Sequence, residues 1–155
     1  MEVLPLAPGH LTGCLAVAAS LPEWFGYPHA LEGIERSLRS ERGLVAVEAG
    51  AVAGFVSLAE RFEESVEITY LAVLRERRRE GLGRLLVAAA RDAAAEVGAS
   101  GLCLLTLGPS AGSAHYAETV AFYRAVGFWR TRECRLAEWG GAPALLMTAP
   151  LERLG

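Results

Sequence analysis

Two glycines and a run of arginines stand between an apolar run and a long segment rich in Ala and Leu. The stretch covers residues 75–84, and Gly81 and Gly83 fall where the following segment is expected to begin a helix. The first turn of a helix leaves backbone N–H groups unpaired and carries partial positive charge. Glycines there let a bound group come close to the backbone. This combination predicts a site for an anion, most naturally a phosphate or pyrophosphate.

The residue types in this stretch do not match the two common nucleotide-binding loops. No Gly-Lys-Ser/Thr is present, as a P-loop requires, and the third glycine of the dinucleotide fingerprint is missing at residues 84–86. A tight turn beside a solvated arginine face is the alternative explanation, because short motifs often match by chance. The predicted strands and helices around the stretch are therefore needed to distinguish a phosphate site from a simple turn.

Hydrophobic periodicity predicts the elements that would position this stretch. Residues 66–74 have the pattern of a strand that leads into the glycines, and residues 82–97 have the pattern of the helix that follows. The other expected strands cover residues 2–6, 44–48, 52–58, 102–107, 128–136 and 144–151, and the other helices cover 10–20, 30–40 and 114–126. Residues 21–29 are expected to be a loop. This order predicts one α+β domain over residues 1–155, a mixed sheet with helices on both faces.

Two motifs occur in this order of elements, and together they are similar to a known family. Arg78, Gly81 and Gly83 match the acyl-CoA signature Arg/Gln-x-x-Gly-x-Gly/Ala, and residues 121–128 are similar to an FYxxxGF element. On these motifs the chain resembles the GNAT-type N-acetyltransferases over nearly its full length. The resemblance implies the GNAT fold, in which the central sheet is splayed between its fourth and fifth strands.

The resemblance also implies that acetyl-CoA is the co-substrate and that its acetyl group passes directly to a primary amine. Backbone amides of residues 79–84 would hold the pyrophosphate, and the N–H of Val73 would polarise the thioester carbonyl as charge develops on it. No metal is implied. The implied cofactor contacts are Leu71, Ala72, Val73, Arg78, Arg79, Glu80, Gly81, Leu82, Gly83, Arg84, Tyr116, Phe122 and Tyr123.

Tyr123 is the first of two candidates for proton transfer. It matches the family's tyrosine that protonates the departing CoA thiolate. A phenol with a pKa near 10 does not favour proton transfer to a thiolate with a pKa near 8.5, so hydrogen bonding or a shifted pKa would have to assist. The alternative is that Tyr123 packs beside Phe122 as a half-buried helix residue.

Glu67 is the second candidate, as the base that removes a proton from the amine. It lies eleven positions before Arg78, the spacing of the catalytic glutamate in some family members. A carboxylate beside an apolar site can have a pKa raised toward neutrality. Strict alternation would put Glu67 on the same face of the strand as Leu71 and Val73, although a bulge would change this. An exposed strand glutamate is the alternative.

Residues 116 and 119 depart from the family's pattern. An Asn that contacts the pantetheine, followed by an Ala three residues later, often stands at these positions, which hold Tyr116 and Thr119 here. His115 is next to them and is a further candidate base, although a loop histidine is more often exposed to solvent.

Aromatic residues in the loop over residues 21–29 are the candidates for contact with the acceptor. Aromatic rings with carboxylates nearby suit a cationic amine, whereas packing over the core is the alternative role for such rings. A small amine, a peptide N-terminus and a protein lysine all stay open as acceptors. So does a non-catalytic acyl-CoA-binding or regulatory module on the same fold. The substrate candidates are Trp24, Phe25, Tyr27 and His29.

Composition limits the partners. The chain has 155 residues, is 52% hydrophobic and carries a net charge of -3, so nucleic acid is not an expected partner. We see neither an apolar run long enough to cross a bilayer nor a signal peptide, which predicts a cytoplasmic protein without membrane contact. Three separated cysteines without a CxxC pair predict neither a disulfide framework nor a zinc site. A homodimer is left open.

Overall fold

Seven strands form one mixed sheet in the computed structural model, which describes residues 1–155. Their order across the sheet is β1-β2-β3-β4-β5-β7-β6. Neighbouring strands are antiparallel except β4 and β5, which are parallel. The strands are β1 (Glu2–Pro5), β2 (Arg42–Glu48), β3 (Ala51–Ala59), β4 (Ser65–Val73), β5 (Gly101–Leu107), β6 (Trp129–Arg135) and β7 (Pro143–Pro150).

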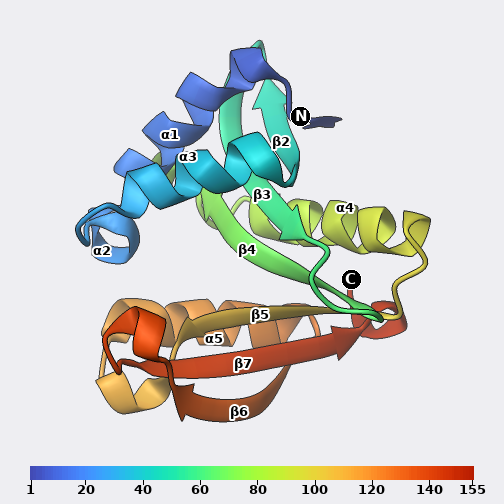
Figure 1. Cartoon of the computed structure of the whole chain (residues 1–155). Helices are drawn as coiled ribbons and strands as arrows, with labels where there is room; N and C mark the ends of the chain where they lie inside the picture. Colours follow the sequence, from blue (N-terminus) through green and yellow to red (C-terminus); the bar gives the residue numbers. More distant parts are fainter.

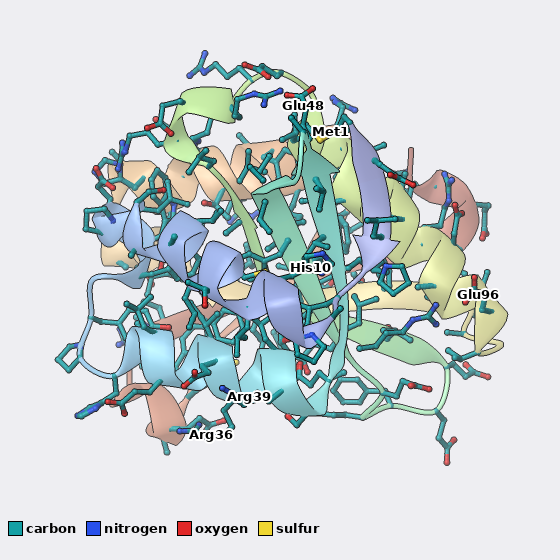
Figure 2. The ribbon with its side chains drawn as sticks, turned by 90° about the horizontal axis from the view of Figure 1, so that it is seen from above. Met1, His10, Arg36, Arg39, Glu48 and Glu96 are labelled. Carbon is teal, nitrogen blue, oxygen red and sulfur yellow. The ribbon has the colours of Figure 1, made fainter.

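Helices cover the two faces of this sheet unequally. The α-helices are α1 (Leu11–Ala19), α2 (Pro22–Phe25), α3 (Ala30–Ser40), α4 (Leu82–Glu96) and α5 (Ala114–Val126). The larger core cluster joins α4 and α5 to one face of the sheet, and the smaller joins α1 and α3 to the other. Helices α1 and α3 lie side by side across β2 to β4 (Figure 2). No buried residue of β5, β6 or β7 belongs to the smaller cluster, so α1 and α3 cover only the N-terminal half of the sheet.

The parallel pair β4 and β5 is joined over only part of its length. Pairing runs from Ser65 with Gly101 to Ile68 with Leu104, although β4 continues to Val73. Beyond the paired residues the two strands diverge toward the end of the molecule that carries α2 (Figure 1). The splay expected between the fourth and fifth strands is therefore confirmed.

A bulge at Thr69 accompanies the divergence. Ser57 of β3 pairs with Tyr70 and the next residue, Leu58, pairs with Ile68, so Thr69 is an extra residue in β4. The Thr69 hydroxyl donates to Glu41 Oε2 at 2.6 Å and lies 2.6 Å from the hydroxyl of the fully buried Ser57. These bonds satisfy polar groups that would otherwise be buried without a partner, and they stabilise the bulge.

The bulge reverses which side chains of β4 share a face. Ile68 packs in the cluster of α4 and α5, and so do Leu71 and Val73 beyond the bulge. Glu67 alternates with Ile68 and faces the side of α1 and α3, where Tyr70 also packs. The strict alternation that put Glu67 on the face of Leu71 and Val73 is therefore wrong, because Thr69 adds one residue to the count.

The expected loop over residues 21–29 contains one helical turn, α2, and this part of the prediction is wrong. Pro22 occupies the first position of the turn, where its missing N–H has no partner to lose. The turn ends where the N–H of Gly26 donates to the carbonyl of Pro22 at 2.9 Å. The other strands and helices begin and end within two residues of their expected bounds.

Candidate active site

The turn before α4 presents the unpaired N–H groups that the sequence predicted. Arg79 and Gly81 have positive φ angles of 69° and 88°, which bend the chain from a short 3-10 turn into the helix. No side chain caps the N-terminus of α4. The N–H groups of its first turn therefore point away from the helix without an intrahelical acceptor. This end of α4 has the geometry of an anion site.

The two signature glycines are required for different reasons. A Cβ atom at Gly81 would meet no atom within 4 Å, so its positive φ and the open space beside it account for this glycine. A Cβ atom at Gly83 would lie 2.9 Å from Cζ of Phe122. The expected close approach of a ligand is therefore not the whole reason for Gly83. It also lets α5 pack on the start of α4, so the two motifs of the sequence meet in space.

Backbone donors of β4 face the gap between β4 and β5. The N–H of Leu74 donates to the carbonyl of Ala53 on β3 at 2.8 Å. In an antiparallel pair the bonded positions alternate, so the N–H groups of Val73 and Leu71 point away from β3. Pairing with β5 has ended at Ile68, and these two N–H groups have no strand opposite them. The N–H of Val73 therefore points into the gap.

Tyr123 lies in α5 among other aromatic rings. Its side chain is 6% exposed, and its ring centroid is 5.1 Å from that of Phe122 and 5.4 Å from that of Phe128. The hydroxyl has no protein hydrogen-bond partner, yet no fully buried side-chain oxygen or nitrogen of the protein is without one. The hydroxyl therefore reaches accessible space. Burial raises the pKa of Tyr123, so the phenol keeps its proton at neutral pH.

Glu67 lies near two charged side chains, Arg61 and Glu41, at the end of the gap where β4 and β5 are still paired. Its Oε1 lies 3.4 Å from Nε of Arg61, whose guanidinium also lies 3.7 Å from Oε1 of Glu41. Burial raises the pKa of Glu67, the positive charge of Arg61 opposes this, and the negative charge of Glu41 adds to it. Glu67 precedes the bulge at Thr69 by two residues, so a carboxylate with a raised pKa stands next to the start of the divergence.

Trp24 of α2 accepts and donates hydrogen bonds at the open end of the gap. Its indole Nε1 donates to Oγ1 of Thr119 at 2.9 Å, and its carbonyl accepts from the hydroxyl of Tyr116 at 2.9 Å. The guanidinium of Arg78 lies 4.6 Å over the indole ring, and the ring of His115 lies 5.1 Å from it. The two residues that depart from the family's pattern therefore bind the same tryptophan, which ties α2 to α5 and to the signature arginine.

These contacts bring together residues that the sequence analysis assigned to two different binding sites, one for the acceptor and one for the cofactor. Trp24 was a candidate for the acceptor and Tyr116 for the cofactor, yet they contact each other. Sequence reasoning singled out Tyr116 and Thr119 as departures from the family's pattern but did not predict that both contact Trp24. A signal was present, because two polar or aromatic residues replace Asn and Ala on one helix while a tryptophan stands in the facing loop.

The remaining aromatic candidates lie on the side of α1 and α3. The ring of Phe25 is 6.3 Å from that of Tyr70 on β4. Tyr27 is 52% exposed, and partial loss of hydration with Tyr70 and Tyr116 nearby raises its pKa above the usual value. His29 is exposed and its Nδ1 lies 3.1 Å from Glu32. Phe25, Tyr27 and His29 line a cavity of about 370 Å³.

We expect the hydrogen bond between Trp24 and Thr119 to stabilise the attachment of α2. Trp24→Phe and Thr119→Val each remove one partner, so the double variant should lose less than the sum of the single losses. The coupling should be about 0.5–1.5 kcal/mol in the free energy of unfolding, measured in urea. As the control, Trp24→Phe is combined with Thr131→Val, which removes a hydroxyl contact with Thr148 and not with Trp24, so these two losses should be additive. Strictly additive losses for Trp24 and Thr119 would show that this bond contributes nothing.

The structure has neither a metal-binding cluster nor a membrane-spanning helix. It contains no group of three or more His, Cys, Asp or Glu side chains placed to hold a metal ion. None of its helices has both the length and the apolar character needed to cross a membrane.

Comparisons with known proteins agree on one family. The family described as the acetyltransferase (GNAT) domain matches residues 39–130, which include both motifs. The chain belongs to the GNAT acetyltransferase family. A sequence comparison with curated proteins gives no significant match.

Solved structures share the fold. A GNAT-family structure from Desulfovibrio desulfuricans is 19% identical with a TM-score of 0.83, covering 97% of this chain and 98% of that one. The ribosomal-protein-S18-alanine N-acetyltransferase from Escherichia coli is 19% identical with a TM-score of 0.75, covering 99% and 96%. An aminoglycoside 6'-N-acetyltransferase complexed with coenzyme A is 18% identical with a TM-score of 0.72, covering 97% of both chains.

Proposed function

We propose that the protein is an N-acetyltransferase that uses acetyl-CoA and transfers the acetyl group directly to a primary amine. The observation that carries this proposal is the divergence of β4 and β5 beyond Ile68, which leaves the N–H groups of Leu71 and Val73 without a strand opposite them. The gap leads to the uncapped N-terminus of α4 at one end and to Glu67 at the other. A structural neighbour in complex with coenzyme A supports the choice of co-substrate.

The residues at the start of α4 fit a pyrophosphate. Gly81 leaves open space beside the backbone, and the first turn of α4 supplies N–H donors. Arg79 and Arg84 have no carboxylate within 4 Å, whereas Arg78 lies 3.4 Å from Glu118 on α5. We propose that Arg78 exchanges this exposed contact for a phosphate oxygen, since an exposed ion pair is worth little. The arginine would then bind the pyrophosphate while its guanidinium stays over Trp24.

Three groups of the chain, the N–H of Val73, the carboxylate of Glu67 and the hydroxyl of Tyr123, would act on the reacting atoms. Acetyl-CoA supplies the acetyl thioester when it is bound. The N–H of Val73 donates to the thioester oxygen as negative charge develops on it. Glu67 accepts a proton from the attacking amine, through a water molecule where the separation requires it. The raised pKa of Glu67 favours this proton transfer near neutral pH.

Tyr123 has a more limited role in this scheme than full proton transfer. Its raised pKa makes the phenol a weaker acid than free tyrosine, so complete transfer to a thiolate is less favoured than at reference values. A phenol that keeps its proton is nevertheless a good hydrogen-bond donor to the sulfur as negative charge develops there. We propose that Tyr123 stabilises the leaving group by this hydrogen bond.

The acceptor would approach from the side of α1 and α3. Glu67 faces that side, and so do Phe25 and Tyr70. A small amine, a peptide N-terminus and a lysine all fit an approach to this face. A cytoplasmic location and a homodimer stay predictions of the sequence.

Release of free CoA thiol with a panel of amines tests the proposal. The panel holds an aminoglycoside, a peptide with a free α-amino group, and an N-acetylated peptide with one lysine. The chain contains no lysine, so its own side chains provide no ε-amine, and thiol release without added amine measures hydrolysis together with any transfer to the chain's own α-amine. We expect amine-dependent release with at least one acceptor. Binding of acetyl-CoA without turnover on a broad panel would instead indicate a non-catalytic acyl-CoA-binding module.

A further inference from the structure

Four arginines that the proposed reaction does not use lie together around β6 and the neighbouring part of α5. Arg130 and Arg132 come from β6, Arg124 from α5, and Arg153 from the 3-10 turn that follows β7. We call these four the arginine patch. They line a wide hollow of about 790 Å³ that contains none of the residues proposed to bind acetyl-CoA or the amine.

No member of the arginine patch forms an ion pair within the protein, although Arg130 lies close enough to Glu133 for their charges to interact. None of its four members has a carboxylate oxygen within 4 Å, although seven other arginines form such pairs. The one carboxylate in the hollow, Glu133, accepts hydrogen bonds from the N–H and hydroxyl of Ser110 at 3.0 and 2.8 Å. The chain as a whole carries a net charge of -3, so this concentration of positive charge runs against its average.

The patch lies on an edge strand. β6 is the last strand of the sheet, pairs only with β7, and is exposed along nearly its whole length. A bulge at Thr131 interrupts the register between β6 and β7. On each side of this bulge, alternate N–H and C=O groups of β6 point outward without a partner. An extended peptide can bind such an edge as an additional strand.

An aromatic residue completes the surface. Trp129, the first residue of β6, is 48% exposed, and the guanidinium of Arg153 lies 4.8 Å over its ring. Arg153 is held in place because its Nε donates to the carbonyl of Gly127 at 2.8 Å. Trp and Arg are the residue types most enriched at the energetic centres of protein interfaces.

We infer that β6 and the arginine patch bind an acidic, extended polypeptide segment, which adds to the sheet as an eighth strand. The unpaired backbone edge favours a polypeptide over a nucleic acid, which cannot continue the ladder. Two copies of the chain pairing edge to edge would bring Arg130 and Arg132 close to the same arginines, and like charges oppose this. An acidic partner instead complements the charge.

Binding of a capped peptide tests this inference independently of acetyl transfer. The probe is a fluorescent octapeptide of alternating Glu and Val with both ends blocked, so that it has no amine to accept an acetyl group. We expect it to bind the wild-type protein, with about tenfold weaker binding when Gln replaces Glu. Arg130→Glu combined with Arg132→Glu should also weaken binding about tenfold or more. Fluorescence anisotropy measures each affinity.

A matched charge reversal separates local from general electrostatics. Arg36 and Arg39 lie on the outer side of α3 (Figure 2), and Arg36→Glu with Arg39→Glu changes the net charge by the same amount. We expect this control to bind the Glu–Val peptide within about twofold of the wild type, because exposed charges beyond a Debye length are screened. An equal loss in both double variants would overturn the inference.

Further arms test the kind of partner and the mode of binding. N-methylation of alternate peptide bonds removes the donors needed for strand addition, so this peptide should not bind. Unchanged binding of the N-methylated peptide would overturn strand addition. Displacement of the peptide by acetyl-CoA, or tighter binding of an oligoribonucleotide of equal charge, would overturn the proposed partner. Absence of binding by the Glu–Val peptide would do the same.

Discussion

Tyr123→Phe should lower kcat about a hundredfold and leave the KM for acetyl-CoA within about twofold. The hydroxyl is the only group removed, and it is proposed to act on the sulfur as negative charge develops there. Binding of the rest of the cofactor depends on the start of α4 and on β4, which the substitution does not touch. Steady-state kinetics with a saturating amine measure both parameters.

Stability provides the control for this variant. The Tyr123 hydroxyl has no protein hydrogen-bond partner, and its ring packs against Phe122 and Phe128, contacts that a phenylalanine keeps. The free energy of unfolding should therefore change by less than about 0.5 kcal/mol. Unchanged kcat in this folded variant would leave Tyr123 with a packing role alone.

Glu67→Gln should lower kcat/KM at least about a hundredfold and, at pH 7, raise the melting temperature. The pKa of Glu67 is raised in the folded protein because burial outweighs the attraction of Arg61. Protonated Glu67 therefore favours folding below the unfolded pKa of 4.5, and this contribution is lost as the pH rises through the folded pKa. At pH 7 the ionised, partly buried carboxylate is unfavourable, and a neutral amide removes that cost.

The pH profile distinguishes a base from a structural glutamate. In the wild type, kcat/KM should rise with pH as Glu67 loses its proton, and Glu67→Gln should lack this rise. Arg61→Ala should move the rise to higher pH, because the Arg61 charge lowers the pKa of Glu67. A profile that keeps the same acidic limb in Glu67→Gln would assign that limb to another group, such as His115 or the acceptor amine itself. Turnover equal to wild type would remove Glu67 from the mechanism.

Local patterns in the sequence were sufficient to predict most of the fold. Each long strand and helix has a hydrophobic period or a terminal glycine of its own, such as Gly98 with its positive φ of 78° after α4. The short turn α2 has too few residues for a period. The bulge at Thr69 depends on Ser57 and Glu41, which lie on other elements and contact it only after folding. Its effect on the face of Glu67 could therefore not be counted from β4 alone.

The candidate site likewise contains features that local patterns predict and features that depend on contacts between distant residues. The glycine turn was recognisable because its residues are close together in sequence and Gly81 meets a local backbone requirement, whereas the packing of Phe122 against Gly83 could not be predicted. The contacts of Trp24 with Tyr116 and Thr119 join residues 92 and 95 positions apart, and no local pattern marks them. The arginine patch was also missed, since its members come from three elements and only Arg130 and Arg132 are near each other in sequence.

A crystal structure of the protein with coenzyme A tests the central claim most directly. We predict that the pyrophosphate lies against the backbone N–H groups of residues 79–84 and that the pantetheine lies between the diverging ends of β4 and β5. The sulfur should then lie within hydrogen-bond distance of the Tyr123 hydroxyl. Coenzyme A bound elsewhere on the protein, with the start of α4 free of phosphate, would contradict the account.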